Sequence, residues 1–311
     1  MNRKERIDAA IRCEAVDRMP WSVWFHFGLH FRPGSDTGQV HVDFFRHYQP
    51  DFLKVMNDYP YPIPSLIGHP MSLDDLKACS EVVKPSADGL GTQLECLDTV
   101  LAAVGDDAHV VDTIFDPWVI LRQLVGKRRM QWFQAEHPDE LKSALDGIAR
   151  SMAGYVRAAL ERGLSGVFYS AGMAGREKMT DSEYEEFCMP YDLIVLEASK
   201  DAAFNMLHIH GEEVRFNMLK DYPVHALSWA GQRTTPGMAE ARALTDKCLA
   251  TGLEETVATS VAPHEIREQV RAAAAAMGTT GTIIAPGCAV QPNLPVANIR
   301  AIQEAIEELA S

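Results

Sequence analysis

Short apolar segments rich in β-branched and aromatic residues alternate with longer amphipathic segments along the whole chain of 311 residues. Eight of the short segments are strand candidates, at residues 19–26, 51–58, 109–116, 166–171, 204–210, 224–229, 248–253 and 281–287. Amphipathic segments such as 138–163 and 262–278 lie between them, and a closing helix is expected at 298–310. Parallel strands joined by helices have right-handed crossovers, and eight such units close a barrel. The alternation therefore predicts an α/β fold, a single (β/α)8 TIM barrel domain over residues 1–311.

An open, doubly wound sheet is the alternative architecture for alternating strands and helices. Nucleotide-binding folds carry a glycine-rich loop after a strand, of the form G-x-G-x-x-G or G-x-x-x-x-G-K-[ST]. No expected strand of this chain is followed by such a loop. The sequence therefore favours the closed barrel.

The balance of charged residues argues against several classes of partner. The formal net charge is −14, which disfavours nucleic acid and anionic membranes as main partners. No run approaches about 18 uninterrupted apolar residues, so no membrane span is expected. The first 18 residues are charged and amphipathic, which predicts a helix over 1–18 packed on the barrel rather than a secretory signal. Six cysteines without C-x-x-C spacing indicate free thiols and a cytoplasmic protein.

Residues suited to chemistry gather at the carboxyl ends of the expected strands, which is where the active sites of TIM barrels lie. In chain order these residues are His26, His30, Asn57, Asp58, Asp116, Tyr169, His208, His210, Trp229, Gln232, Glu254, Glu255 and Cys288. The carboxyl end of the barrel is therefore the expected site of function.

Two histidines, His208 and His210, end the expected strand 204–210 and alternate with apolar residues. Because side chains alternate along a strand, the two imidazoles share one face, with their Cα atoms roughly 6.6 Å apart. Cys288 directly follows the expected strand 281–287. Two imidazoles and a thiolate with an open fourth position are typical of catalytic zinc. The three residues are therefore candidate zinc ligands.

Two acidic residues after the histidine pair, Glu212 and Glu213, are candidates for a fourth ligand or for a partner of a ligating histidine. The same pattern also has a simpler interpretation. Two histidines at a strand end are often hydrogen-bonded polar residues, and a single cysteine after a strand is usually only buried. The residues alone leave both interpretations open.

Several segments together carry a family resemblance: MNRKERIDAAIRCEAVDRMP, GVFYSAGMAG, YEEFCMPYDLIVLEA, LHIHGE, DYPVHALSW and IIAPGCAVQPNLPVANIRAI. They resemble the opening, the middle and the C-terminal half of the uroporphyrinogen decarboxylase superfamily. Its members begin with a basic helix that leads through Asp-Arg-x-Pro to the first strand. The resemblance covers nearly the whole chain and implies a (β/α)8 barrel, in agreement with the strand count.

One branch of that superfamily is uroporphyrinogen decarboxylase proper, which needs no cofactor and clamps substrate carboxylates with paired arginines. The corresponding stretch here is WFHFGLHFRPG, which lacks both arginines and retains only Arg32 nearby. A substrate with many carboxylates needs charge-assisted partners, which this stretch does not supply. Asp58 and Tyr169 match the family's strand-end aspartate and tyrosine, so a cofactor-free decarboxylase of porphyrin metabolism stays as the alternative function.

The other branch contains zinc-dependent methyltransferases that exchange methyl groups between a corrinoid and a thiol or another acceptor. Their metal motif is His-x-Cys on one strand and a distal cysteine. His208 and Cys288 match that motif, and His210 stands where the middle cysteine would be. The resemblance thus implies Zn²⁺ held by these three residues, and a methyl group moved between a small thiol or methyl ether and a corrinoid.

Further roles follow from this reading of the sequence. We expect a small-molecule substrate, a corrinoid carried by a partner protein, and a monomer or homodimer. Proton handling is assigned to Asp58, Asp116 and Tyr169, and the substrate wall to His26, His30, Trp24, Trp229 and Gln232. A metal-dependent hydrolase and a binding module without chemistry are the remaining alternatives.

Overall fold

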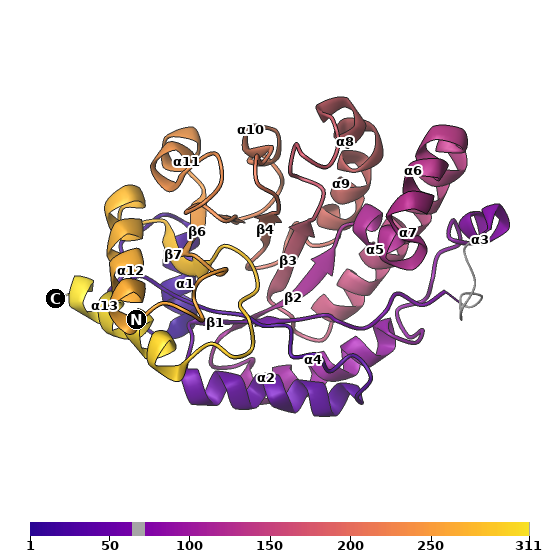
Figure 1. Cartoon of the computed structure of the whole chain (residues 1–311). Coiled ribbons are helices and arrows are strands. Elements are labelled where there is room, and N and C mark those ends of the chain that lie inside the picture. The colour runs from indigo at the N-terminus through magenta and orange to yellow at the C-terminus, as the bar shows by residue number, and fades with distance from the viewer. Residues whose placement is uncertain (64–71, 311) are drawn as a thin grey trace.

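Seven parallel strands form one curled sheet in the computed structural model, which describes residues 1–63 and 72–310 (Figure 1). The strands follow the sheet in chain order: β1 (Phe52–Val55), β2 (His109–Phe115), β3 (Gly166–Ala171), β4 (Met206–Ile209), β5 (Ala226–Ser228), β6 (Cys248–Leu253) and β7 (Thr282–Pro286). Every neighbouring pair is parallel, as in a TIM barrel. Seven of the eight expected strands and the α/β barrel architecture are confirmed.

The remaining expected strand, the first along the chain at residues 19–26, is a wrong prediction. The segment nevertheless occupies the position of a strand in the barrel. Its backbone forms only isolated bridges, of which Trp21 with Ile284 lies on the β7 side. The Ser22 N–H donates to the Ile284 carbonyl at 3.1 Å, and the Ile284 N–H donates to the Pro20 carbonyl at 2.8 Å. On the other side, the Asp51 N–H donates to the Trp21 carbonyl at 2.9 Å. The segment therefore closes the barrel between β7 and β1, and Pro20, which has no N–H, limits its ladder.

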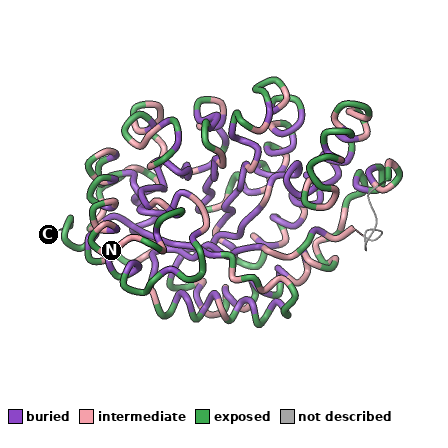
Figure 2. Tube along the Cα trace, in the orientation of Figure 1, coloured by how far each residue is buried: buried purple, intermediate pink, exposed green. Residues whose placement is uncertain are grey.

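Helices cover the outer face of the curled sheet, and the burial pattern follows this layering (Figures 1 and 2). Their bounds are α2 (Gly34–Tyr48), α3 (Leu73–Ala78), α4 (Leu90–Val104), α5 (Pro117–Val125), α6 (Lys127–Glu136), α7 (Pro138–Leu160), α8 (Asp181–Phe187), α9 (Met189–Glu197), α10 (Phe216–Leu219), α11 (Met238–Leu244), α12 (Pro263–Met277) and α13 (Val296–Ala310). The three helices expected from periodicity correspond to α7, α12 and α13. Within the described residues, no helix combines the length and the apolar character that a membrane crossing requires.

The N-terminal helix α1 (Arg3–Ile11) covers the amino end of the barrel. Ile7 and Ala10 pack with side chains from the barrel interior, including Phe52 and Phe204. The helix is shorter than the expected 1–18, because Cys13 adopts a left-handed backbone conformation with φ of 54°. In this structure the helix thus lies against side chains of the barrel interior.

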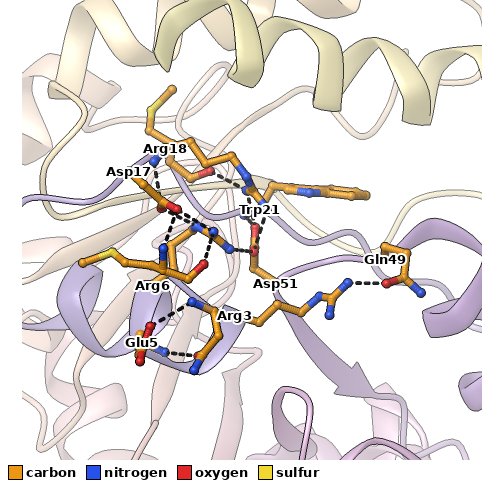
Figure 3. A network of polar contacts seen from close by, with 11 residues as sticks. Arg3, Glu5, Arg6, Asp17, Arg18, Trp21, Gln49 and Asp51 are labelled. Carbon is orange, nitrogen blue, oxygen red and sulfur yellow. Dashed lines mark hydrogen bonds and ion pairs between the residues drawn. The ribbon is translucent and has the colours of Figure 1, made fainter. Parts of the chain in front are cut away.

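A buried ionic network holds the closing segment to α1 and β1 (Figure 3). Asp51 is fully buried and accepts hydrogen bonds from Arg6 at 2.6 Å, from Arg18 at 2.7 Å and from the Trp21 N–H at 3.0 Å. Arg6 also binds Asp17 at 2.7 Å. The network satisfies the carboxylate of Asp51 from three directions, which a buried charge requires. This is the structural role of the Asp-Arg-Met-Pro stretch.

Candidate metal centre

The histidine pair lies at the carboxyl end of β4, where strand alternation sets its direction. His208 faces the barrel interior and stacks on Phe168 of β3, with ring centroids 5.5 Å apart and an interplanar angle of 24°. Leu207 and Ile209 point to the opposite side and belong to the core between sheet and helices. His208 is buried and His210 is half-buried, and their ring centroids lie 5.5 Å apart. The predicted common face of the two imidazoles is thus observed.

Cys288 approaches the histidine pair from the loop after β7. Its Sγ lies 3.8 Å from His210 Nδ1, and the ligand atoms of His208, His210 and Cys288 all lie within 4.8 Å of one another. The preceding residue, Gly287, passes so close to Ala230 that an added Cβ would lie 2.6 Å from the Ala230 Cα. A side chain at position 287 would push the loop away, so glycine permits the approach of the thiol. The structure brings the three residues together.

The chemistry of this donor set fits a transition metal. His208 Nε2 is buried and has no hydrogen-bond partner in the described part of the chain, whereas Nδ1 lies 3.5 Å from Ser228 Oγ. Burial, followed by the nearby His210 and Lys54, lowers the pKa of His208 well below its usual value. Burial and Lys178 lower the pKa of His210 to about 4. Both imidazoles are therefore neutral at pH 7, the form that binds a metal.

The thiol of Cys288 does not ionise readily in its buried position. Burial is the main cause that raises the pKa of Cys288 above its ordinary value. A metal ion reverses this preference because a coordinating thiol is deprotonated. Two neutral imidazoles and one thiolate are the ligand types that zinc prefers, so the residues present fit zinc.

The acidic residues that follow the histidine pair do not join this cluster. Glu212 and Glu213 are exposed, and among the described residues only the two histidines and Cys288 form a group able to share an ion. A different carboxylate faces the loop that carries the cysteine. Glu255 binds Arg233 through Oε1 at 2.9 Å, while its buried Oε2 lacks a partner within the described chain and lies against Gly287. The fourth-ligand role expected for Glu212 or Glu213 therefore has no support in the geometry.

A pocket of about 480 Å³ opens above the carboxyl ends of β1 and β2. His26 Nδ1 lies 2.6 Å from Asp58 Oδ1 at this pocket, with His26 half exposed. The lining mixes aromatic, aliphatic and polar side chains, and includes His26, His30, Asp58, Tyr59, Tyr61, Leu90, Phe115, Ile120, Gln123 and Met152. The structure thus brings together three of the residues expected from the sequence, His26, His30 and Asp58.

Two of the expected catalytic residues have structural partners instead. Tyr169 is fully buried on the outer face of β3 and donates to Asp192 at 2.6 Å. Asp116 caps α5 by accepting from the Val119 N–H at 2.7 Å, and it also accepts from the Gly172 N–H at 2.5 Å. Burial raises the pKa of Asp116. Tyr169 points away from the barrel interior, so its position does not fit the proton-handling role expected from the sequence.

The expected substrate wall is also only partly present. Trp229 is buried on the outer side, packs on Phe216 and donates its Nε1–H to the Pro236 carbonyl at 2.9 Å. Gln232 donates to the Gly252 carbonyl. Trp24 is buried among the aromatic side chains that fill the barrel interior. Trp229 therefore cannot line the site, because strand alternation turns it toward the helices.

Sequence reasoning missed Lys54, a buried lysine of β1. Its Nζ lies 4.4 Å from the ring centroid of Phe168, the ring on which His208 stacks. A charged residue within the buried run Phe52–Val55 was the available signal, because lysine is rarely buried without a reason.

Comparison with known proteins gives this geometry a family. The model of the family described as "Uroporphyrinogen decarboxylase (URO-D)" matches residues 55–309. The chain belongs to the uroporphyrinogen decarboxylase family. None of the curated protein sequences matches it significantly.

Solved structures with the same fold include other members of this broad architecture. A methyltransferase from Methanosarcina mazei is similar at a TM-score of 0.80 and 17% identity, with 100% of both chains covered. A B12-independent methionine synthase from Shewanella sp. W3-18-1 is similar at a TM-score of 0.57 and 10% identity, covering 94% of this chain and 93% of the other. A putative vitamin-B12 independent methionine synthase from Listeria monocytogenes reaches 0.58 and 9%, covering 89% and 86%. At these identities the likeness shows the fold alone.

Proposed function

We propose that this chain is a zinc-dependent methyltransferase of the uroporphyrinogen decarboxylase family. The proposed reaction moves a methyl group between a small thiol or methyl ether and a corrinoid. The observation that carries the proposal is the convergence of His208, His210 and Cys288, whose ligand atoms lie within 4.8 Å of one another. The similarity in fold to a methyltransferase from Methanosarcina mazei supports it.

The protein side chains prepare the centre before any substrate arrives. Phe168 fixes the plane of His208 by stacking, and the Ser228 contact at Nδ1 leaves Nε2 as the nitrogen for the metal. A zinc ion held by the three residues would act as a Lewis acid and lower the pKa of a thiol or hydroxyl group. Since His210 is a neutral imidazole rather than a thiolate, the centre would be about one charge more positive than a His-Cys-Cys site.

Proton handling is assigned to the pair at the pocket. Asp58 accepts from His26 Nδ1 at 2.6 Å, which fixes the tautomer of the imidazole and leaves its Nε2 to exchange a proton. The described lining of the pocket contains aromatic and aliphatic side chains, one carboxylate and no lysine or arginine, which suits a small aryl compound better than a polycarboxylate. Asp116, which caps α5, and Tyr169, which faces the helices, are assigned structural roles.

Metal content and methyl transfer test this proposal directly. Purified protein should contain about one zinc per chain, and His208→Ala and Cys288→Ala should lose both the metal and the activity while circular dichroism stays unchanged. Cys13→Ala is the matched control, because Cys13 is also half-buried but lies outside the cluster. Methylated cobalamin with simple thiols, and methoxyarenes with reduced cobalamin, are the two assay directions.

Three results would contradict the proposal. Metal-free wild-type protein with full activity would exclude a role for zinc. Conversion of uroporphyrinogen to coproporphyrinogen would favour the cofactor-free decarboxylase instead. Methyl transfer at the same rate without any corrinoid would show that a corrinoid is not the methyl carrier.

A further inference from the structure

Lys54 occupies the barrel interior without the partner that a buried charge normally has. It is 4% exposed and lies on the inner face of β1, between Phe52 and Met56, which belong to the interior cluster. Its Nζ contacts the Met56 sulfur at 3.4 Å and lies over the rings of Phe168 at 4.4 Å and Trp24 at 5.6 Å. A thioether is a weak acceptor, so the ammonium keeps most of its hydrogen-bonding capacity unused.

The other deeply buried cations of the protein form ion pairs with carboxylates. Arg6 binds both Asp17 and Asp51, and Arg215 binds Asp181 at 2.8 Å. Within residues 1–63 and 72–310, no carboxylate lies within ion-pair distance of Lys54. Burial of an ammonium without an ion pair is costly, and Lys54 differs in this respect from the other buried cations. Burial lowers the pKa of Lys54 to about 7, although Cys288, Asp112 and Asp58 act on it in the opposite direction without forming an ion pair.

The position of Lys54 links it to the candidate metal centre. Phe168 contacts both the ammonium of Lys54 and the ring of His208. The sheet register places Ser170, the next inward residue after Phe168, beside His208. A ligand that reaches the metal centre from the barrel mouth would therefore come close to Lys54 on the same inner surface.

We propose that Lys54 is the receptor for a carboxylate of the substrate, which would make the substrate a small, singly charged organic acid. Calling the bound acid a substrate rests on the function proposed above. A single ammonium balances a single negative charge, which suits a carboxylate better than a phosphate dianion. The faces of Phe168 and Trp24 beside the ammonium favour an acid that carries an aromatic ring.

Binding of matched probes tests this receptor without any catalytic reaction. Benzoate and benzamide have nearly the same shape and differ in charge, and inorganic phosphate tests the other common oxyanion. Calorimetric titration is performed on the protein as purified and again after zinc removal with a chelator. Benzoate should bind at least ten-fold more tightly than benzamide and than phosphate in both states, because a charge-assisted hydrogen bond in a buried site discriminates on that scale.

Two lysine variants identify the residue responsible. Lys54→Met keeps the length of the side chain and removes the charge, so it should bind both aromatic probes equally and should raise the melting temperature of the ligand-free protein. Lys200→Met is the control, because Lys200 lies at the surface beside Glu197 and should leave the benzoate preference unchanged. If Lys54→Met fails to fold, Lys54→Gln provides the same comparison.

Other outcomes would overturn the receptor. These are equal affinity of wild-type protein for benzoate and benzamide, tighter binding of phosphate, absence of benzoate binding, or a benzoate preference that survives in Lys54→Met. A preference for benzoate in a protein without methyl transfer would instead refute only the proposed function. Methyl transfer without that preference would refute only the carboxylate receptor.

Discussion

Replacing His208 by leucine tests the metal centre through stability, and the sign of the effect should depend on zinc. His208 is 3% exposed and its Nε2 lacks a partner among the described residues. A buried polar atom of this kind costs about 1–3 kcal/mol, and the 3.5 Å contact with Ser228 recovers little. Leucine removes that cost together with the stacking on Phe168, worth about 0.5–1.5 kcal/mol. Metal-free His208→Leu should therefore range from about 0.5 kcal/mol less stable to about 2.5 kcal/mol more stable than wild type.

Zinc should reverse this order. A ligand at 100 times its dissociation constant stabilises the folded state by about 2.7 kcal/mol, and only the wild-type protein keeps all three ligands. For a chain of 311 residues, an unfolding entropy of about 2.1 cal/mol/K per residue makes 1 kcal/mol correspond to about 1.5 °C in melting temperature. Zinc should thus raise the melting temperature of wild-type protein by about 4 °C and leave that of His208→Leu unchanged.

Thermal unfolding followed by circular dichroism, with a chelator and with buffered zinc, measures both effects. His264→Leu is the control for zinc binding at the surface, because His264 is an exposed histidine at the start of α12. An equal zinc-induced shift in wild-type protein and His208→Leu would refute the reasoning. So would metal-free His208→Leu that is clearly less stable than metal-free wild-type protein.

Two further predictions concern residues around the site. Burial lowers the pKa of His41 to about 4, and its neutral ring donates to Thr37 and accepts from the Met56 N–H, so the unfolded state binds a proton that the folded state excludes. Acidification from pH 6.5 to 4 should lower the free energy of unfolding, measured with urea, by up to about 3 kcal/mol. In His41→Gln the free energy of unfolding should depend less steeply on pH, and an unchanged pH dependence would contradict the prediction. Tyr169→Phe removes a buried hydrogen bond to Asp192 and should cost about 1–3 kcal/mol. Zinc content and kcat of Tyr169→Phe should stay at the wild-type level. A fall in kcat without a loss of stability would instead indicate that Tyr169 has a catalytic role.

The sequence predicted the strands well because strands of a parallel barrel are buried on both faces and appear as apolar runs. The run 19–26 has the same character and is buried up to Phe25, but Pro20 and single bridges replace a continuous ladder there. Helices α2 and α4 were not expected. Gly34 and Gly38 weaken the helical pattern of α2. Glycine is needed there because α4 packs closely against α2: an added Cβ at Gly38 would lie 2.7 Å from the Cys96 carbonyl oxygen in α4.

The histidine pair of the candidate metal centre was predictable because His208 and His210 lie at the end of one strand, where local alternation sets direction. The orientation of Tyr169 depends on register instead. Ser170 of β3 pairs with His208 of β4, so Tyr169 pairs with Leu207 and shares its outward direction. Register between strands far apart in the chain is set by packing, which periodicity within one strand does not contain. Lys54 was visible as a charge within an apolar run, but its isolation from carboxylates required coordinates.

Closure of the barrel by the segment around Trp21 determines when the candidate metal centre can form during synthesis of the chain. The closing hydrogen bonds join this N-terminal segment to Ile284, and Cys288 follows four residues later. Contacts between such distant parts of a chain form slowly, because a long loop must be ordered first. During synthesis on the ribosome, the closing contacts of Ile284 and the thiol of Cys288 therefore become available together, after strands β1 to β6 have emerged. An incomplete chain would leave the histidines on an open sheet, where they cannot yet capture an ion with the thiol.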